Sequence, residues 1–300
     1  YRVNLQNLNR GPTKTITLSS GTELPISELI FDADYLISLP TVKTHAEAGL
    51  SIACKNWVGL VHGQHKRLMH RDLAGNIVGL IARLPPQLIV VDGVIAMEGN
   101  GPGDGAPVPM GLLAASDNPF VCDLAMCQLL GFSWDNVPYL ARALKEGAIG
   151  QPLIDEITTQ IRTRKTIQAA PPPSLLARLS DRPSLFWLKK AVRPLTGRVA
   201  VAKLAYRAGI IQDVYNPVDD SLRLNRRQSE LCRSCRRCEA FCPMGLGLEQ
   251  IGAQPKSPYC IDCLYCYWVC PKNALTVDGQ AGALERQLRR YKSTIEGLKG

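Results

Sequence analysis

Two short blocks near the carboxyl end of the chain carry four cysteines each in the same rhythm. They read CRSCRRCEAFCP from Cys232 and CIDCLYCYWVCP from Cys260. Both follow the spacing Cys-x2-Cys-x2-Cys-x3-Cys-Pro, in which three thiolates can surround one four-iron cubane. The fourth cysteine, followed by Pro243 or Pro271, then reaches the other cubane. The repeat therefore predicts a compact fold built around two metal clusters.

This spacing predicts two crossed sets of ligands. The first set is Cys232, Cys235, Cys238 and Cys270, and the second is Cys260, Cys263, Cys266 and Cys242. A pair of zinc sites is the alternative, but zinc takes four ligands per site and has no use for this repeated pattern. We therefore expect two [4Fe-4S] clusters as cofactors, and the repeat resembles that of a small α+β ferredoxin-like domain, which would cover residues 229–280.

The remaining cysteines argue against a disulfide scaffold. Eight of the eleven cysteines lie in the two blocks, and Cys54, Cys122 and Cys127 are scattered. A secreted disulfide framework is normally short and spreads its cysteines along the chain. At 300 residues, with hydropathy near zero and no apolar run long enough to span a bilayer, the sequence predicts a soluble chain of one or two domains.

Charged and aromatic residues surround the cysteines. Arg233, Arg236 and Arg237 lie among the ligands of the first block, where they either favour a reduced cluster and dock an acidic partner or form a solvated loop. The second block is crowded by aromatic residues, which we expect to shield the clusters from water: Tyr259, Tyr265, Tyr267 and Trp268.

Residues 1–150 alternate strand-like and helix-like segments. The predicted strands are YLISLP from Tyr35, QLIVVDG from Gln87 and GLLAAS from Gly111. The predicted helices are 71–84, capped by Asp72, then 117–131, and then a third from about 136 to 147. This alternation predicts an α/β domain with a mainly parallel sheet and flanking helices.

In such a sheet, ligands bind beyond the carboxyl ends of the strands. Three polar stretches, TVKTHAE, DGVIAMEGNGPGDG and SDN, follow the predicted strands, so a pocket at one edge competes with ordinary loop chemistry. The candidates for binding an anion or moving a proton are Lys43, His45, Lys55 and Asn56, assisted by Asp92 and Glu98. GNGPGDG suits either a lid over the pocket or a simple turn.

The segment 151–228 is predicted as a basic helical bridge. Between residues 161 and 211 there are eleven cations and one acid, which account for most of the net charge of +9. The segment either bridges the two domains or contacts a membrane surface or an acidic partner, and nucleic acid is not expected because no binding module accompanies the charge. Residues 281–300 are predicted as a helical tail.

Two resemblances follow from these motifs. Residues 229–277 resemble the bacterial-type ferredoxin module with two [4Fe-4S] clusters. The segments LPTVKTHAEAGLSIACKNWVGL, VDGVIAMEGNGP and ASDNPFVCDLA resemble the domain-of-unknown-function 362 family, which is often joined to such a module. The second resemblance implies a redox-associated protein, fixes no substrate, and leads us to expect further sequence upstream of Tyr1.

The sequence thus predicts an iron–sulfur oxidoreductase, or a subunit of one, that relays electrons to or from the α/β pocket. The alternatives are a non-enzymatic carrier whose α/β domain docks a partner, and a nucleic-acid or regulatory protein whose clusters are structural or redox-sensing. We expect a redox partner protein, and the pocket leaves room for a small-molecule substrate or a further organic cofactor. Oxygen-sensitive clusters favour the cytoplasm, unless an export signal precedes Tyr1.

Overall fold

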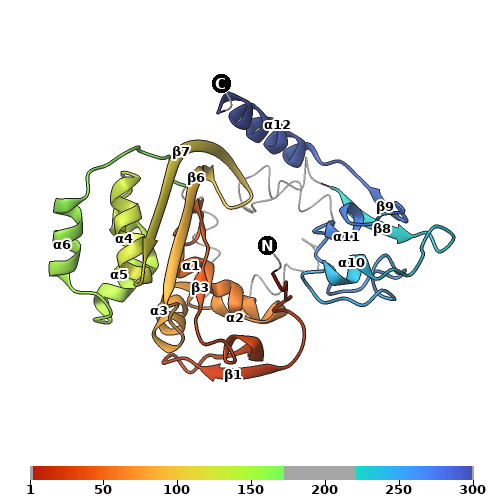
Figure 1. Cartoon of the computed structure of the whole chain (residues 1–300), viewed down its shortest axis with the longest axis horizontal. Helices are drawn as coiled ribbons and strands as arrows, with labels where there is room; N and C mark the ends of the chain where they lie inside the picture. The colour runs from red at the N-terminus through yellow and green to blue at the C-terminus, as the bar shows by residue number, and fades with distance from the viewer. Residues whose placement is uncertain (1–2, 172–220, 299–300) are drawn as a thin grey trace, which may run out of the picture.

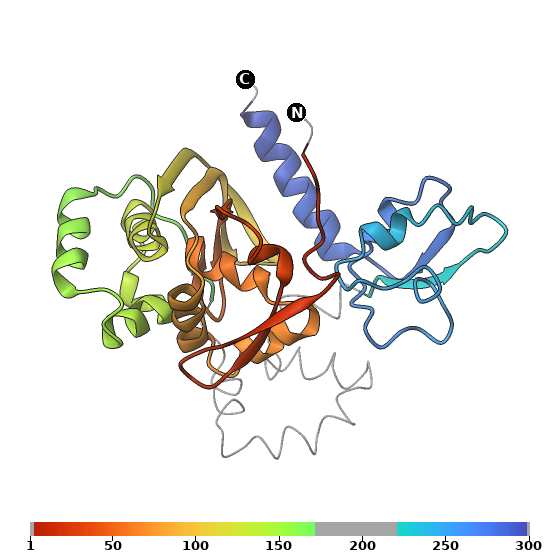
Figure 2. The same ribbon diagram turned by 60° about the horizontal axis from the view of Figure 1, so that its bottom comes forward.

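The computed structural model describes residues 3–171 and 221–298 (Figure 1). These residues form an α/β domain, a C-terminal module over residues 221–280, and a final helix. Figure 2 shows the C-terminal module set to one side of the α/β domain, with the N-terminal segment and the final helix between them. Residues 172–220 of the predicted basic helical bridge lie outside the described residues.

The main sheet is organised around one long strand, β6 (Leu88–Asn100). Strands β3 (Ile37–Ser38) and β4 (Thr41–His45) pair parallel with β6, and β5 (Gly49–Ser51) pairs antiparallel with β4. On its other side β6 pairs antiparallel with β7 (Asp104–Ser116). A separate hairpin joins β1 (Thr13–Thr17) to β2 (Glu23–Ser27).

The predicted α/β class is therefore confirmed, but the sheet is mixed rather than mainly parallel. The difference arises at GNGPGDG, which is the turn of the β6–β7 hairpin and not a loop beyond a finished strand. The polar residues predicted to follow LIVV instead continue β6 as far as Asn100. Because β7 runs back along β6, Ser116 pairs with Ile89 at the opposite end from Glu98.

The predicted helices are confirmed. They are α3 (Leu73–Arg83), α4 (Pro119–Leu129) and α5 (Pro138–Lys145). The Asp72 side chain accepts from the Gly75 amide, and Asn118 caps α4 in the same way, because both supply an oxygen to amides that lack partners inside the helix. Figure 1 shows α4, α5 and α6 (Gln151–Gln160) together on one side of β6 and β7.

The strand predicted over YLISLP is shorter and less buried than expected. Only Ile37 and Ser38 are paired, and Ile37 and Leu39 are 52% and 70% exposed. Ser38 faces the interior together with the partly buried Leu36, so Ile37 and Leu39 lie on the opposite face of the sheet. The apolar composition, which suggested a buried strand, does not distinguish the two faces.

The start of the predicted bridge belongs to the α/β domain. Ile154 and Ile157 of α6 are buried in its core, where α6 packs against α4. Beyond α6, the side chains of Arg164 and Lys165 donate to the β7 carbonyls of Gly111 and Pro109. In the described part of the basic segment these cations therefore attach the chain to the sheet.

The C-terminal module is built on a two-stranded antiparallel sheet of β8 (Arg223–Arg227) and β9 (Leu275–Asp278). Two short helices, α10 (Arg237–Ala240) and α11 (Tyr265–Trp268), contact each other beside it. The final helix α12 (Gly282–Gly297) packs along β7, where Arg290 lies 3.5 Å from Asp104. No helix within residues 3–171 or 221–298 is long and apolar enough to cross a membrane.

Candidate functional site

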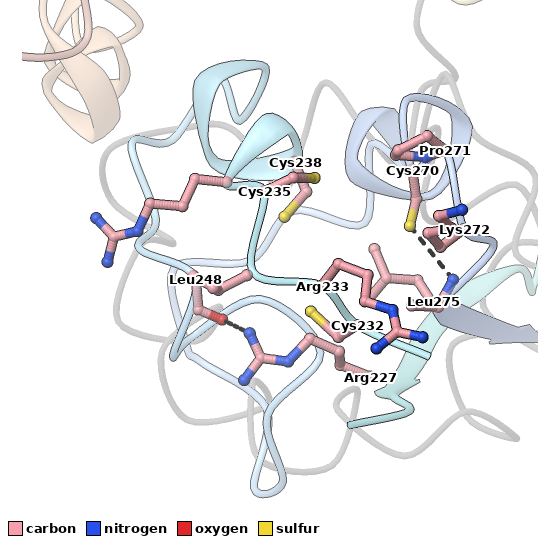
Figure 3. Close-up of a pocket in the computed structure, with 12 residues that line it drawn as sticks. Arg227, Cys232, Arg233, Cys235, Cys238, Leu248, Cys270, Pro271, Lys272 and Leu275 are labelled. Carbon is pink, nitrogen blue, oxygen red and sulfur yellow. Dashed lines mark hydrogen bonds between the residues drawn. The ribbon is translucent and has the colours of Figure 1, made fainter. Parts of the chain in front are cut away.

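The eight block cysteines lie around two cavities in the C-terminal module. Cavity A is lined by Cys232, Cys235, Cys238 and Cys270 (Figure 3). Cavity B is lined by Cys242, Cys260, Cys263 and Cys266. Each cavity thus receives three cysteines from one block and the fourth from the other, which is the grouping that the spacing predicts.

The fourth cysteines of the two blocks have matching environments. The Leu246 amide donates to Cys242 Sγ over 3.4 Å, and the Ala274 amide donates to Cys270 Sγ over 3.3 Å. In both blocks the donor is four residues after the cysteine. A thiolate that binds metal is stabilised by such donors, because they offset part of its negative charge.

The residues between the first three cysteines share an unusual backbone conformation. Ser234 and Asp262 occupy the same place in the two blocks and have φ values of 51° and 53°. Arg236 and Leu264 also correspond, with φ values of 57° and 60°. Left-handed residues other than glycine are uncommon, and in successive turns they aim backbone N–H groups at an anion. This repeated geometry suits sulfide-rich clusters.

Three of these thiols, one at cavity A and two at cavity B, have a raised pKa in the absence of a cation. Burial and neighbouring cysteines raise the pKa of Cys238 and Cys263, and burial with Cys263 nearby raises the pKa of Cys266 to about 12. Iron would reverse this effect, because a coordinated thiol is deprotonated by the metal charge. The cysteines, amides and backbone turns of both cavities therefore fit [4Fe-4S] clusters.

The spacing of the cysteines does not suit a single ion. Among the described residues, no three side chains of His, Cys, Asp or Glu are gathered closely enough to hold one metal ion. The ligands of tetrahedral zinc all lie about 2.3 Å from the metal and hence close together. The repeated eight-cysteine spacing, with four cysteines at each of two cavities, favours [4Fe-4S] clusters over the zinc alternative.

The aromatic residues of the second block do not form the expected shield. Tyr259, Tyr265 and Trp268 are 58%, 56% and 68% exposed. Tyr267 is half-buried and packs edge-on against Trp268, with 5.4 Å between ring centroids. Aliphatic side chains line the cavities instead, among them Leu224, Leu246, Ile251 and Leu264 in cavity B.

A short N-terminal strap, residues 7–10, connects the module to the α/β domain. Asn7 Nδ2 donates to the carbonyl of Cys242 over 3.0 Å, and Arg10 donates to the carbonyl of Glu239. On the other side, Asn9 Oδ1 accepts from the Gly63 amide over 2.9 Å. The strap therefore attaches to the segment of the module that supplies Cys242 to cavity B. The sequence contains no signal for this contact.

In the α/β domain the structure brings Lys43, His45 and Lys55 together. Burial lowers the pKa of both lysines, and Lys43 adds to the effect on Lys55. His45 Nδ1 accepts from the amides of Glu47 and Ala48, each over 3.2 Å. Burial and the nearby Lys55 lower the pKa of His45 to about 4, so its ring is neutral at pH 7.

An open hollow of about 470 Å³ lies beside this group. Its wall includes His45 and Glu47 of one segment and Phe132 and Asn136 of another. Its size lies within the range of about 300–1,000 Å³ that is typical of small-molecule sites. Lys66, which the sequence did not single out, also interacts with Lys55 and donates to Asn9 of the strap over 3.4 Å.

The other candidates lie apart from this group. Asn56 Nδ2 donates to Ser38 Oγ over 3.2 Å. Asp92 is exposed and accepts from the Val94 amide, whereas Glu98 accepts from the Gln168 amide over 2.9 Å. The three polar stretches therefore do not form the single pocket that a parallel sheet would produce, because SDN lies at the far end of the β6–β7 hairpin.

The three remaining histidines have different environments. His70 Nδ1 lies 2.7 Å from Glu47 Oε2, and His65 is exposed. His62 is half-buried, and its Nε2 atom has no hydrogen-bond partner among the described residues. They are not gathered into a metal site within the described ranges.

A buried carboxylate that the sequence analysis missed holds Lys55 in place. Asp123 of α4 is fully buried and accepts from the amides of Ala53 and Cys54 over 2.8 and 3.0 Å. The Tyr139 hydroxyl also donates to it, over 2.8 Å. These bonds fix the start of α1 (Ala53–Asn56), which carries Lys55. The one available signal was an acid inside the apolar run FVCDLAMC.

Two regions of the chain match known protein families. Residues 1–128 match the model of a domain of unknown function, DUF362, and residues 224–280 match that of a 4Fe-4S dicluster domain. A curated relative, a thylakoid-associated protein of Synechocystis sp., is 31% identical over 156 residues, which are 50% of this chain and 48% of that protein. The chain thus spans about half of the relative's length, and no solved structure matches it. The chain joins a DUF362 domain to a 4Fe-4S dicluster domain, as its motifs predicted.

Proposed function

We propose that this protein is an iron–sulfur oxidoreductase, or a subunit of one, with two [4Fe-4S] clusters. The observation that carries the proposal is the pair of cavities, each lined by four cysteines in a crossed grouping. The dicluster domain supports an electron-transfer role in its own right. Bound clusters would supply one-electron chemistry, because each can gain and lose a single electron.

In this proposal the residues of the module hold and tune the clusters. Cys232, Cys235, Cys238 and Cys270 are the ligands at cavity A, and Cys242, Cys260, Cys263 and Cys266 are the ligands at cavity B. The Leu246 and Ala274 amides stabilise one thiolate of each set. The strap holds the ligand segment of Cys242 to the α/β domain, so we assign cavity B to the end of the relay that exchanges electrons with that domain.

The hollow beside His45 is the proposed site of a small molecule or a further organic cofactor. Lys43 and Lys55 lie near His45 without lining the hollow, and neither has an ion-pair partner among the described residues. An anionic group at the His45 wall would add to the nearby Glu47 carboxylate in offsetting the repulsion between the two lysines. His45 holds its Nδ1 lone pair on backbone amides, which leaves Nε2–H as a donor toward a ligand. Asn56, Asp92 and Glu98 are not needed for this contact.

A non-enzymatic carrier is the alternative, and turnover distinguishes the two. Cluster-loaded protein, reduced anaerobically, would be mixed with a panel of carboxylate and phosphate-bearing oxidants, and cluster reoxidation would be followed by absorbance. The proposal predicts that at least one oxidant is reduced and that His45→Asn slows this at least tenfold while leaving the cluster spectrum intact. His65→Asn, at an exposed histidine, is the matched control. Reoxidation by protein partners alone would favour the carrier.

The described structure also indicates which basic residues are not free to contact a membrane surface. The relative's name associates that protein with thylakoids. In the present chain Arg164 and Lys165 are bound to β7, so we propose that any contact with a membrane surface uses basic residues later in the segment 161–211. Because [4Fe-4S] clusters are sensitive to oxygen, we propose that the protein works in a reducing compartment.

A further inference from the structure

The two cluster cavities differ in the charge around them. Four cations line cavity A: Arg227, Arg233, Arg236 and Lys272. Figure 3 shows the side chains of Arg233 and Lys272 beside the sulfurs of Cys232 and Cys270. Among the described residues, no cation lines cavity B, and the one charged residue in its lining is Asp262.

Most of the charge around cavity A is not neutralised. Neither Arg233 nor Lys272 has an ion-pair partner among the described residues, and Arg227 donates to the carbonyl of Leu248. Arg236 lies 3.6 Å from Glu239 but remains 66% exposed. A cluster with its four thiolates adds about −2, so this end would stay slightly positive when it is loaded.

The charge around cavity B is balanced differently. Asp262 is paired with Lys256 and lies 3.6 Å from Arg223. Both cations are therefore paired with Asp262. A cluster bound at cavity B would leave this end of the module with a net negative charge. The strap, which binds the segment of Cys242, also attaches here and makes no hydrogen bond to a residue that lines cavity A.

Cavity A also opens at the protein surface. Cys235 is exposed, as are Arg233, Arg236 and Lys272 around it. A partner seated on these cations would lie close to the cluster edge. Exposed cations attract a partner that carries negative charge and speed its association. Salt screens this attraction.

We propose that the cations around cavity A, Arg227, Arg233, Arg236 and Lys272, form the docking surface for the acidic face of a one-electron redox protein. This rests on the proposed function and adds the site and the charge of the partner. In the productive complex the reduced partner loses one electron and the oxidised cluster at cavity A gains it, with no bond made or broken. The reverse transfer uses the same surface.

The test measures electron transfer from an acidic probe, a reduced plant-type [2Fe-2S] ferredoxin, to the cluster-loaded protein by anaerobic stopped flow. The double variant Arg233→Glu/Lys272→Glu reverses two charges beside cavity A. Arg83→Glu/Lys145→Glu makes the same change at exposed sites of α3 and α5. At low salt we expect the first variant to react at least tenfold more slowly than the wild type, and the second to match the wild type within twofold.

Two further readouts separate the possible outcomes. The wild-type rate falls steeply with ionic strength, whereas the rate of Arg233→Glu/Lys272→Glu does not. Methyl viologen radical, a small cationic reductant, reduces the clusters of this variant no more slowly than those of the wild type. If the two glutamates lower the iron content of the protein, the variant Arg233→Gln/Lys272→Gln with full iron replaces it. Its electron-transfer rate should fall by about threefold, because the charges are removed and not reversed.

Equal rates for the two double variants would overturn the docking proposal while leaving the clusters in place. Wild-type protein that viologen cannot reduce would instead refute the proposed function. Anionic phospholipid vesicles provide the remaining comparison. If these vesicles bind the wild type but not the variant, and the ferredoxin rates are equal, the cations serve a membrane surface and the redox-protein assignment is wrong.

Discussion

Replacing Asp123 with alanine should severely destabilise the α/β domain. The carboxylate is fully buried and accepts three hydrogen bonds, from the amides of Ala53 and Cys54 and from the Tyr139 hydroxyl. Alanine removes the acceptor and leaves all three donors without a partner inside the protein. Each unpaired buried donor costs about 1–3 kcal/mol. Allowing for some relaxation, the free energy of unfolding should fall by about 3–6 kcal/mol.

This loss is a large part of the total, since domains are typically stable by only about 5–15 kcal/mol. Tyr139→Phe removes one of the three donors and should cost about 1–2 kcal/mol. Asp117→Ala is the matched control, because this acid is exposed immediately before α4, and it should stay within about 0.5 kcal/mol of the wild type. The double variant Asp123→Ala/Tyr139→Phe should cost less than the sum of its parts, since both changes break the same bond.

Urea unfolding followed by far-ultraviolet circular dichroism would measure these differences on cluster-loaded protein. Burial raises the pKa of Asp123 from 3.8 to about 6, despite the hydrogen bonds that lower it. The folded chain therefore holds this proton more tightly than the unfolded chain. The resulting stability is full below about pH 4 and is lost as the pH rises through about 6. An Asp123→Ala variant within about 1 kcal/mol of the wild type at pH 7 would refute this reasoning.

Three further changes test other parts of the structure. Cys270→Ala should lose the cluster at cavity A and about half of the iron, whereas Cys127→Ala, at a buried cysteine outside the blocks, should keep it. Asn7→Ala should loosen the module without loss of iron, seen as broader distance distributions between spin labels on the two domains, while exposed Asn4→Ala should not. Because His45 has a pKa of about 4, below its ordinary 6.5, its contribution to stability is present above about pH 6.5 and is lost as the pH falls through 4. NMR titration of His45 checks this value, and Lys55→Met should raise it.

The sequence was most informative where a short repeat implies a geometry. Cysteine spacing alone led to the grouping around cavities A and B, because three residues per block must face one point and the fourth must turn away. The helix caps at Asp72 and Asn118 were also predictable, since capping depends on a few neighbouring residues.

Features that depend on distant contacts could not be predicted. Asn7 and Cys242 are 235 residues apart, and nothing in the pattern around Asn7 marks it as a contact. The parallel sheet was overestimated because a turn at GNGPGDG and a crossover connection both need glycine-rich polar sequence, and only the β6–β7 pairing distinguishes them. Because the hairpin carries SDN to the far end of the sheet, the three polar stretches do not meet at one edge. The structure instead brings together a smaller group, Lys43, His45 and Lys55.

Iron and sulfide analysis of anaerobically reconstituted protein, with Mössbauer spectra of the same sample, tests the central claim most directly. The account predicts about eight irons and eight sulfides per chain, all in cubane clusters. Colourless protein, or protein that retains zinc in place of iron under strictly anaerobic conditions, would contradict it.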